Sequence, residues 1–179
     1  MKDYIKNMLK TQFTIQLLML GIVFMIASIF ECREVFTYLA FVCFFTVFDV
    51  VGFGNMIAIP SWAGVIDRGE DQTILTPYRI MQNMFMIIIF IAVYFYTNWI
   101  CLFACVLGGW MGGCDILYYV LLKIKVREQD HYWMRNWSVW LVLTPIKKFF
   151  CINEYIGRKE FQLVCTIGLV TGFLISLVA

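Results

Sequence analysis

The sequence predicts an all-α protein: a polytopic membrane bundle of about five transmembrane helices with one further helix at the cytoplasmic membrane surface. Three observations lead to this prediction. Hydrophobic residues make up 62% of the 179 residues and charged residues only 15%, whereas soluble domains carry roughly 25% charged residues. Uncharged apolar stretches recur along the chain, and the basic residues gather between a few of them.

This composition, with a mean hydropathy of +0.81, excludes several classes of protein. So little charge cannot cover a water-facing surface, so a soluble globular enzyme and a disordered chain are both excluded. A small secreted protein held by disulfides is excluded as well. The formal net charge of +2 gives no reason to expect a nucleic-acid partner. We expect one transmembrane domain over residues 1–179.

The first two spans follow from gaps between charged residues. A membrane-spanning helix needs about 20 mostly apolar residues, and residues 13–30 form one such stretch. The next stretch contains a single charge, Asp49. It predicts a span over about 35–57, weakened near Gly52 and Gly54, and then a short interfacial piece around Pro60 and Trp62. A cleaved signal peptide is not expected, because the first apolar stretch is too long for one.

Two more spans lie between Arg79 and Lys123, where Asp115 is the one charged residue. That length fits two helices and a tight turn. Asparagine tolerates turn geometry, so Thr97-Asn98 is the predicted turn, with spans at 79–96 and 99–122.

The last apolar run predicts a fifth span over 161–179. Residues 132–150 are apolar and rich in tryptophan but contain Arg135 and Pro145 and end in lysines. We interpret about 132–146 as a cytoplasmic interfacial or re-entrant helix. Whether this segment crosses the bilayer is left open.

Orientation follows from the basic residues, which favour short cytoplasmic loops. With the N-terminus in the cytoplasm, five spans put every lysine and arginine except Arg33 on that side. We therefore expect a cytoplasmic N-terminus and a C-terminus on the opposite side.

Asp49 and Asp115 are the candidate substrate- or ion-binding residues. An acidic side chain within a span is costly unless it faces the bundle interior or finds a partner, so such residues are candidates for function. Each lies beside a glycine cluster, and Asn55 and Tyr119 follow at helical spacing. The alternative is that both carboxyl groups only fix packing through hydrogen bonds to residues such as Gln16 or Gln82.

A second candidate site lies at the cytoplasmic surface. His131, Trp133, Arg135 and Trp137 form a lipid- or headgroup-binding set, because aromatic and basic side chains suit the headgroup region. The simpler interpretation is an amphipathic helix resting among the headgroups.

The sequence contains no catalytic signature, so no catalytic residue is predicted and enzyme activity stays open. Cys101 and Cys105 share a helix face, but a zinc site needs further ligands and His131 is the single histidine. No metal site is predicted, and the sequence identifies no cofactor.

Three functions remain. The first is a small transporter or channel-like protein that moves a proton, cation or small solute through the intramembrane carboxylates. The second is an intramembrane lipid-modifying enzyme or lipid-binding protein with a cytoplasmic site. The third is an accessory subunit of a larger membrane complex. Membrane lipids are the expected partners, with a homo-oligomer or a larger assembly as further possibilities.

Overall fold

The computed structural model describes residues 2–53, 72–111 and 158–179, and within them the side chains of 13–48, 51, 80–109, 111 and 162–179. This part of the chain is helical and contains no strand, so the all-α prediction is confirmed for it. The helices are α1 (Lys2–Phe30), α2 (Arg33–Phe53), α4 (Gln72–Tyr96), α5 (Trp99–Trp110) and α10 (Arg158–Val178).

The five helices fall where the five spans were predicted, with different ends. α1 and α4 begin earlier than expected, at Lys2 and Gln72, because helix formation does not stop where hydrophobicity does. α2 ends at Phe53, directly before Gly54.

Within the described residues, α5 covers Trp99–Trp110 of the predicted span 99–122. Gly108 and Gly109 lie in its last turn, and glycine disfavours helix by about 1 kcal/mol relative to alanine. The remainder of that span lies outside the described residues. So do the interfacial piece at Pro60 and Trp62 and the helix expected at 132–146.

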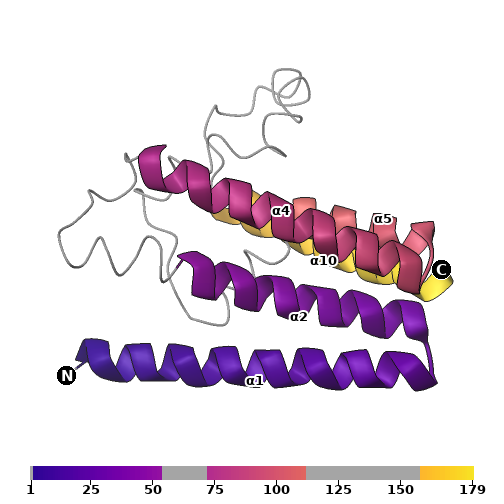
Figure 1. The fold of residues 1–179 in the computed structure, drawn as a ribbon, viewed down its shortest axis with the longest axis horizontal. Coiled ribbons are helices and arrows are strands. Elements are labelled where there is room, and N and C mark those ends of the chain that lie inside the picture. The colour runs from indigo at the N-terminus through magenta and orange to yellow at the C-terminus, as the bar shows by residue number, and fades with distance from the viewer. Residues whose placement is uncertain (1, 54–71, 112–157) are drawn as a thin grey trace.

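The helices lie side by side with their long axes roughly aligned (Figure 1). The turn between α1 and α2, the turn between α4 and α5, and the end of α10 meet at one end of the bundle. We call this the turn end. α2 and α5 therefore both run away from the turn end, while α1, α4 and α10 run towards it.

Asn98 fixes the turn between α4 and α5, as the sequence predicted, but through a helix cap. Its backbone is extended, and its side-chain oxygen accepts a hydrogen bond from the Cys101 backbone N–H at 2.9 Å. Asparagine is among the best N-cap residues because this bond satisfies an otherwise unpaired N–H group. In the turn between α1 and α2, Cys32 adopts a φ of 43°, which is rare outside glycine.

α2 is the central helix, because it packs against α1, α4, α5 and α10. Its side chains are buried over most of its length, and Val51 is its one strongly exposed large hydrophobic residue among those described. A core cluster joins α2 to α4 and α5, with members Tyr38, Phe41, Val42, Phe45, Val93, Cys101, Ala104 and Cys105.

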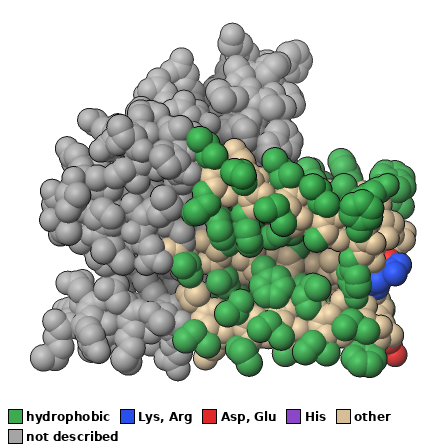
Figure 2. Space-filling model, in the orientation of Figure 1, with side chains coloured by type: hydrophobic (Ala, Val, Ile, Leu, Met, Phe, Trp, Pro, Cys, Tyr) green, Lys and Arg blue, Asp and Glu red, His purple; other side chains and the backbone are tan. Residues whose placement is uncertain are grey.

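The outside of the bundle is apolar. Large hydrophobic side chains are exposed along the whole apolar part of α1 and on outward faces of α4 and α10, among them Met19, Phe30, Ile88, Phe95 and Val170. Figure 2 shows this face covered with hydrophobic side chains, with the coloured charges confined to one end.

Candidate functional site

Most of the predicted site residues lie outside the described part of the chain. This holds for Asn55, Asp115 and Tyr119 of the candidate substrate-binding set, and for the whole headgroup set of His131, Trp133, Arg135 and Trp137. Asp49 lies in α2, where its backbone is helical and its side chain is not described. The structure therefore neither brings these residues together nor separates them.

Helical register places position 49 on a definite face of α2. It follows Val42 by seven residues and Phe45 by four, so the three positions lie on the face that also carries Tyr38. Tyr38 points from this face towards α5 and α10, as the contacts below show.

Position 49 lies nearer the far end of α2 than the sequence suggested. Gly21 of α1 packs against Cys43, since a Cβ atom on Gly21 would lie 3.1 Å from that of Cys43. Six further residues of helix advance about 9 Å. Because α1 and α2 are antiparallel, position 49 is level with about Ile15, near the start of the apolar stretch of α1.

Tyr38 joins three helices, and the sequence analysis did not single it out. Its side chain is 1% exposed, and its hydroxyl donates a 2.8 Å hydrogen bond to the Leu169 carbonyl oxygen of α10. Gly108 of α5 and Gly172 of α10 leave room for the phenol, because a Cβ on either glycine would lie 2.6 Å from the hydroxyl oxygen. The tyrosine thus occupies a space that two glycines create.

Small side chains form the contact between α5 and α10. On α5 they are Cys101, Ala104, Cys105 and Gly108, as the glycine and cysteine pattern of this span suggested. On α10 the matching positions are Cys165, Gly168, Gly172 and Ser176, a series that the sequence analysis missed. The spacing of three or four residues between these small side chains was the signal that could have found the series. Small residues let helix backbones approach closely, as in helix contacts within membranes.

Aromatic rings form the contact between α2 and α4. Phe48 stacks on Phe85 with ring centroids 4.1 Å apart, and Phe41 contacts Phe90 at 5.7 Å. Such pairs contribute about 0.5–1.5 kcal/mol beyond the burial of their area. Large rings therefore make the described contacts between α2 and α4.

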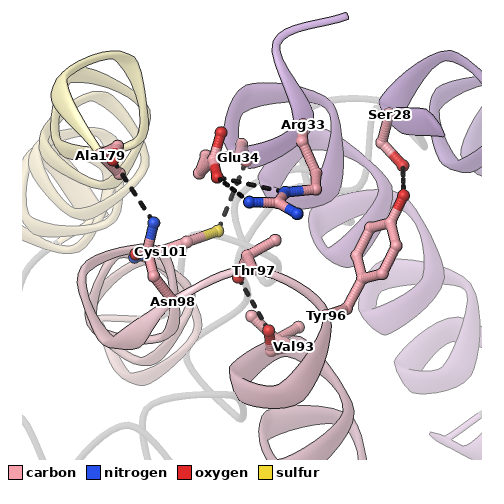
Figure 3. A network of polar contacts seen from close by, with 9 residues as sticks. All are labelled: Ser28, Arg33, Glu34, Val93, Tyr96, Thr97, Asn98, Cys101 and Ala179. Carbon is pink, nitrogen blue, oxygen red and sulfur yellow. Dashed lines mark hydrogen bonds and ion pairs between the residues drawn. The ribbon is translucent and has the colours of Figure 1, made fainter. Parts of the chain in front are cut away.

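Polar contacts gather at the turn end (Figure 3). The Cys101 thiol donates to the Glu34 carbonyl oxygen at 3.4 Å, which joins the starts of α5 and α2. The Ser28 and Tyr96 hydroxyls lie 3.0 Å apart, and Asn98 Nδ2 donates to the Ala179 carbonyl oxygen at 3.4 Å. Most of these groups pair with backbone or with each other, so they hold the helix ends together.

The described residues contain no cluster of three or more metal-ligating side chains. The cysteines among them form no disulfide with one another, and all but Cys32 are buried; they are Cys32, Cys43, Cys101, Cys105 and Cys165. Thr37 of α2 has a buried hydroxyl without a hydrogen-bond partner. This part of the chain holds packing contacts and no reactive constellation.

One described segment, Phe13–Phe30 of α1, is long and apolar enough to cross a membrane, and little of it is buried within the bundle. It coincides with the first predicted span. Ile80–Tyr96, Trp99–Gly109 and Gln162–Val178 are apolar helical segments of shorter length. The chain thus contains one described segment suited to membrane insertion.

Comparisons with protein-family models, with curated proteins and with solved structures find no match to this chain.

Proposed function

We propose that this chain is a multi-pass integral membrane protein with five membrane-spanning segments, to which the five described helices belong; α5 is the described part of the segment 99–122. Its N-terminus lies in the cytoplasm and its C-terminus on the opposite side. The observation that carries this proposal is the distribution of side chains. Large hydrophobic residues cover the outside of α1, α4 and α10, while Ser28, Thr37, Thr46 and Ser176 are buried within the bundle. Exposure of so much hydrophobic surface to water is unfavourable, whereas the hydrocarbon core of a bilayer accommodates it.

The arrangement of the helix ends supports this topology. The turn at 31–34, the turn at 97–98 and the end of α10 meet at one end of the bundle, as chain crossings in alternating directions require. That end contains Arg33 as its one basic residue among positions 31–34 and 97–98. Placing it away from the cytoplasm agrees with the preference of basic residues for cytoplasmic loops.

We further propose that the protein transports a proton, a cation or a small solute, with Asp49 and Asp115 as the binding groups. The chemistry of these two residues supports the proposal. Each is an acidic residue in a stretch that is otherwise without charge, and acidic groups within membrane-spanning segments commonly bind protons or cations. Asp49 lies in α2, the helix that packs against the other four described helices.

A homo-oligomer is part of this proposal, because five short helices form a small carrier. The broad apolar surface of α1 leaves room for contacts between copies as well as with lipid. The oligomeric state in a lipid environment tests this part directly.

The test of transport is a flux measurement with purified protein in sealed phospholipid vesicles. A pH-sensitive dye inside the vesicles reports proton entry, and a potassium or sodium gradient tests cations. We expect Asp49→Asn and Asp115→Asn each to lower the flux at least tenfold. Glu31→Gln is the matched control, because Glu31 is an exposed acid at the turn end. Equal flux in the two Asn variants and the wild type would exclude both carboxyl groups as carriers.

A further inference from the structure

Tyr38 stands out among the described residues because it is the largest side chain that is fully buried. It lies on the same face of α2 as position 49, three helical turns nearer the turn end, or about 16 Å by helical rise. The interface that it fills is therefore the one along which a route from Asp49 to the turn end would run. α5 and α10 form the other two walls of that interface.

The contact of Tyr38 with α10 is specific and breakable. Its hydroxyl donates to the Leu169 carbonyl oxygen, an atom of a helical backbone. Gly108 and Gly172 receive the phenol without covering it with side chains of their own. If α10 moves away from α2, the hydrogen bond between the Tyr38 hydroxyl and the Leu169 carbonyl oxygen has to break.

We propose that Tyr38 is a latch that holds α10 against α2 and α5 and closes the interface between these three helices on the side of the turn end. Release of the hydroxyl from Leu169 lets α10 separate and opens a route towards position 49. The role of the latch in closing a route rests on the proposed transport function. The latch itself requires only the three-helix interface.

Two buried cysteines in this interface can be used to detect its opening. Cys105 of α5 and Cys165 of α10 are both 0% exposed, so a thiol reagent reaches them only when helices separate. Cys43 is equally a buried thiol, but it packs against Gly21 in the contact between α1 and α2. It therefore reports loosening that does not involve α10.

The experiment compares the full-length wild type with Tyr38→Phe in lipid vesicles. Phenylalanine keeps the ring and removes only the hydroxyl, so the fold is retained. Both proteins react with N-ethylmaleimide, and mass spectrometry of peptides gives the labelling rate of each cysteine. When opening is fast relative to labelling, the rate follows the open fraction. The loss of one hydrogen bond then raises it roughly two- to tenfold.

We expect Tyr38→Phe to accelerate labelling of Cys105 and Cys165 and to leave Cys43 unchanged. Tyr94→Phe is the matched control, since Tyr94 is half exposed on α4, and it should change none of the three rates. Unchanged rates at Cys105 and Cys165, or a rise at all three cysteines, would overturn the latch.

Separate experiments can refute the latch and the transport proposal independently of each other. Thiol labelling measures helix separation whether or not anything is transported. The flux of Asp49→Asn measures transport whether or not Tyr38 controls it. Where both hold, Tyr38→Phe raises the flux and Tyr94→Phe does not.

Discussion

The hydroxyl groups of Ser28 and Tyr96 lie 3.0 Å apart and join α1 to α4 near the turn end (Figure 3). α1 packs mainly against α2, so this hydrogen bond attaches it to a second helix. Ser28 also donates to the Met25 carbonyl oxygen at 2.7 Å. Tyr96 therefore has to be the donor of the bond between the helices, since the serine has one hydroxyl proton.

Removing that donor should weaken the attachment of α1. We expect Tyr96→Phe to lower the free energy of unfolding by about 0.5–1.5 kcal/mol, the usual net value of one hydrogen bond. Unfolding by denaturing detergent, followed by circular dichroism, measures this. Tyr94→Phe serves as the comparison, because half of that side chain faces the surroundings. An equal loss in both variants would mean that the bond to Ser28 has no special role.

The two glycines around Tyr38 should differ in their tolerance of a methyl group. A Cβ on Gly172 would lie 2.8 Å from the Ala104 carbonyl oxygen as well as 2.6 Å from the Tyr38 hydroxyl, whereas the three atoms nearest to a Cβ on Gly108 all belong to the Tyr38 side chain. Overpacking costs typically about 1–3 kcal/mol. We expect Gly172→Ala to be the more destabilising in equilibrium unfolding.

A double-mutant cycle separates these two causes. In a Tyr38→Phe background the hydroxyl is absent, so the cost of Gly108→Ala should fall. The cost of Gly172→Ala should persist, because the Ala104 backbone is still present. An equal loss of unfolding free energy for both substitutions in both backgrounds would show that Tyr38 is not the reason why glycine is required at these two positions.

The cap of α5 gives a third prediction. Asn98→Ala removes the acceptor for the Cys101 backbone N–H and should cost about 1 kcal/mol of unfolding free energy. Asn98→Ser should restore most of this unfolding free energy, because serine caps helices well. The recovery should be incomplete, because serine cannot donate to Ala179 as asparagine does. A serine variant as unstable as the alanine variant would assign the effect to the Ala179 contact.

The proposed topology predicts which thiol reacts from the side of the membrane opposite the cytoplasm. Cys32 is exposed at the turn end, so a membrane-impermeant maleimide applied to that side should label it. Cys101 near the same end is fully buried and should stay unlabelled. Labelling of Cys32 only from the cytoplasmic side would reverse the proposed orientation.

The positions of the helices could be predicted from sequence because they follow from hydrophobicity alone. The apolar run 13–30 and the turn at Thr97-Asn98 are visible as a gap between charges and as a polar pair between apolar flanks. The start of α1 at Lys2 was not visible in this way. Its first turns are polar, and the helix continues through them because its backbone hydrogen bonds add residue by residue.

The role of Tyr38 could not be predicted, since it depends on residues far away in the chain. Leu169 follows it by 131 residues, and nothing near Tyr38 indicates that two distant glycines will receive its ring. The candidate carboxyl groups could be selected by their chemistry, and their relation to one another stays a prediction.

The distance along the chain between Tyr38 and its acceptor has a consequence for biogenesis. α2 leaves the ribosome early, whereas the Leu169 carbonyl belongs to α10, which is synthesised after the other four described helices. Until α10 is synthesised, the nascent chain holds the Tyr38 phenol and a column of small residues without their final partner. Premature termination before Arg158 would leave this incomplete helix contact exposed, a surface that quality-control proteases could recognise.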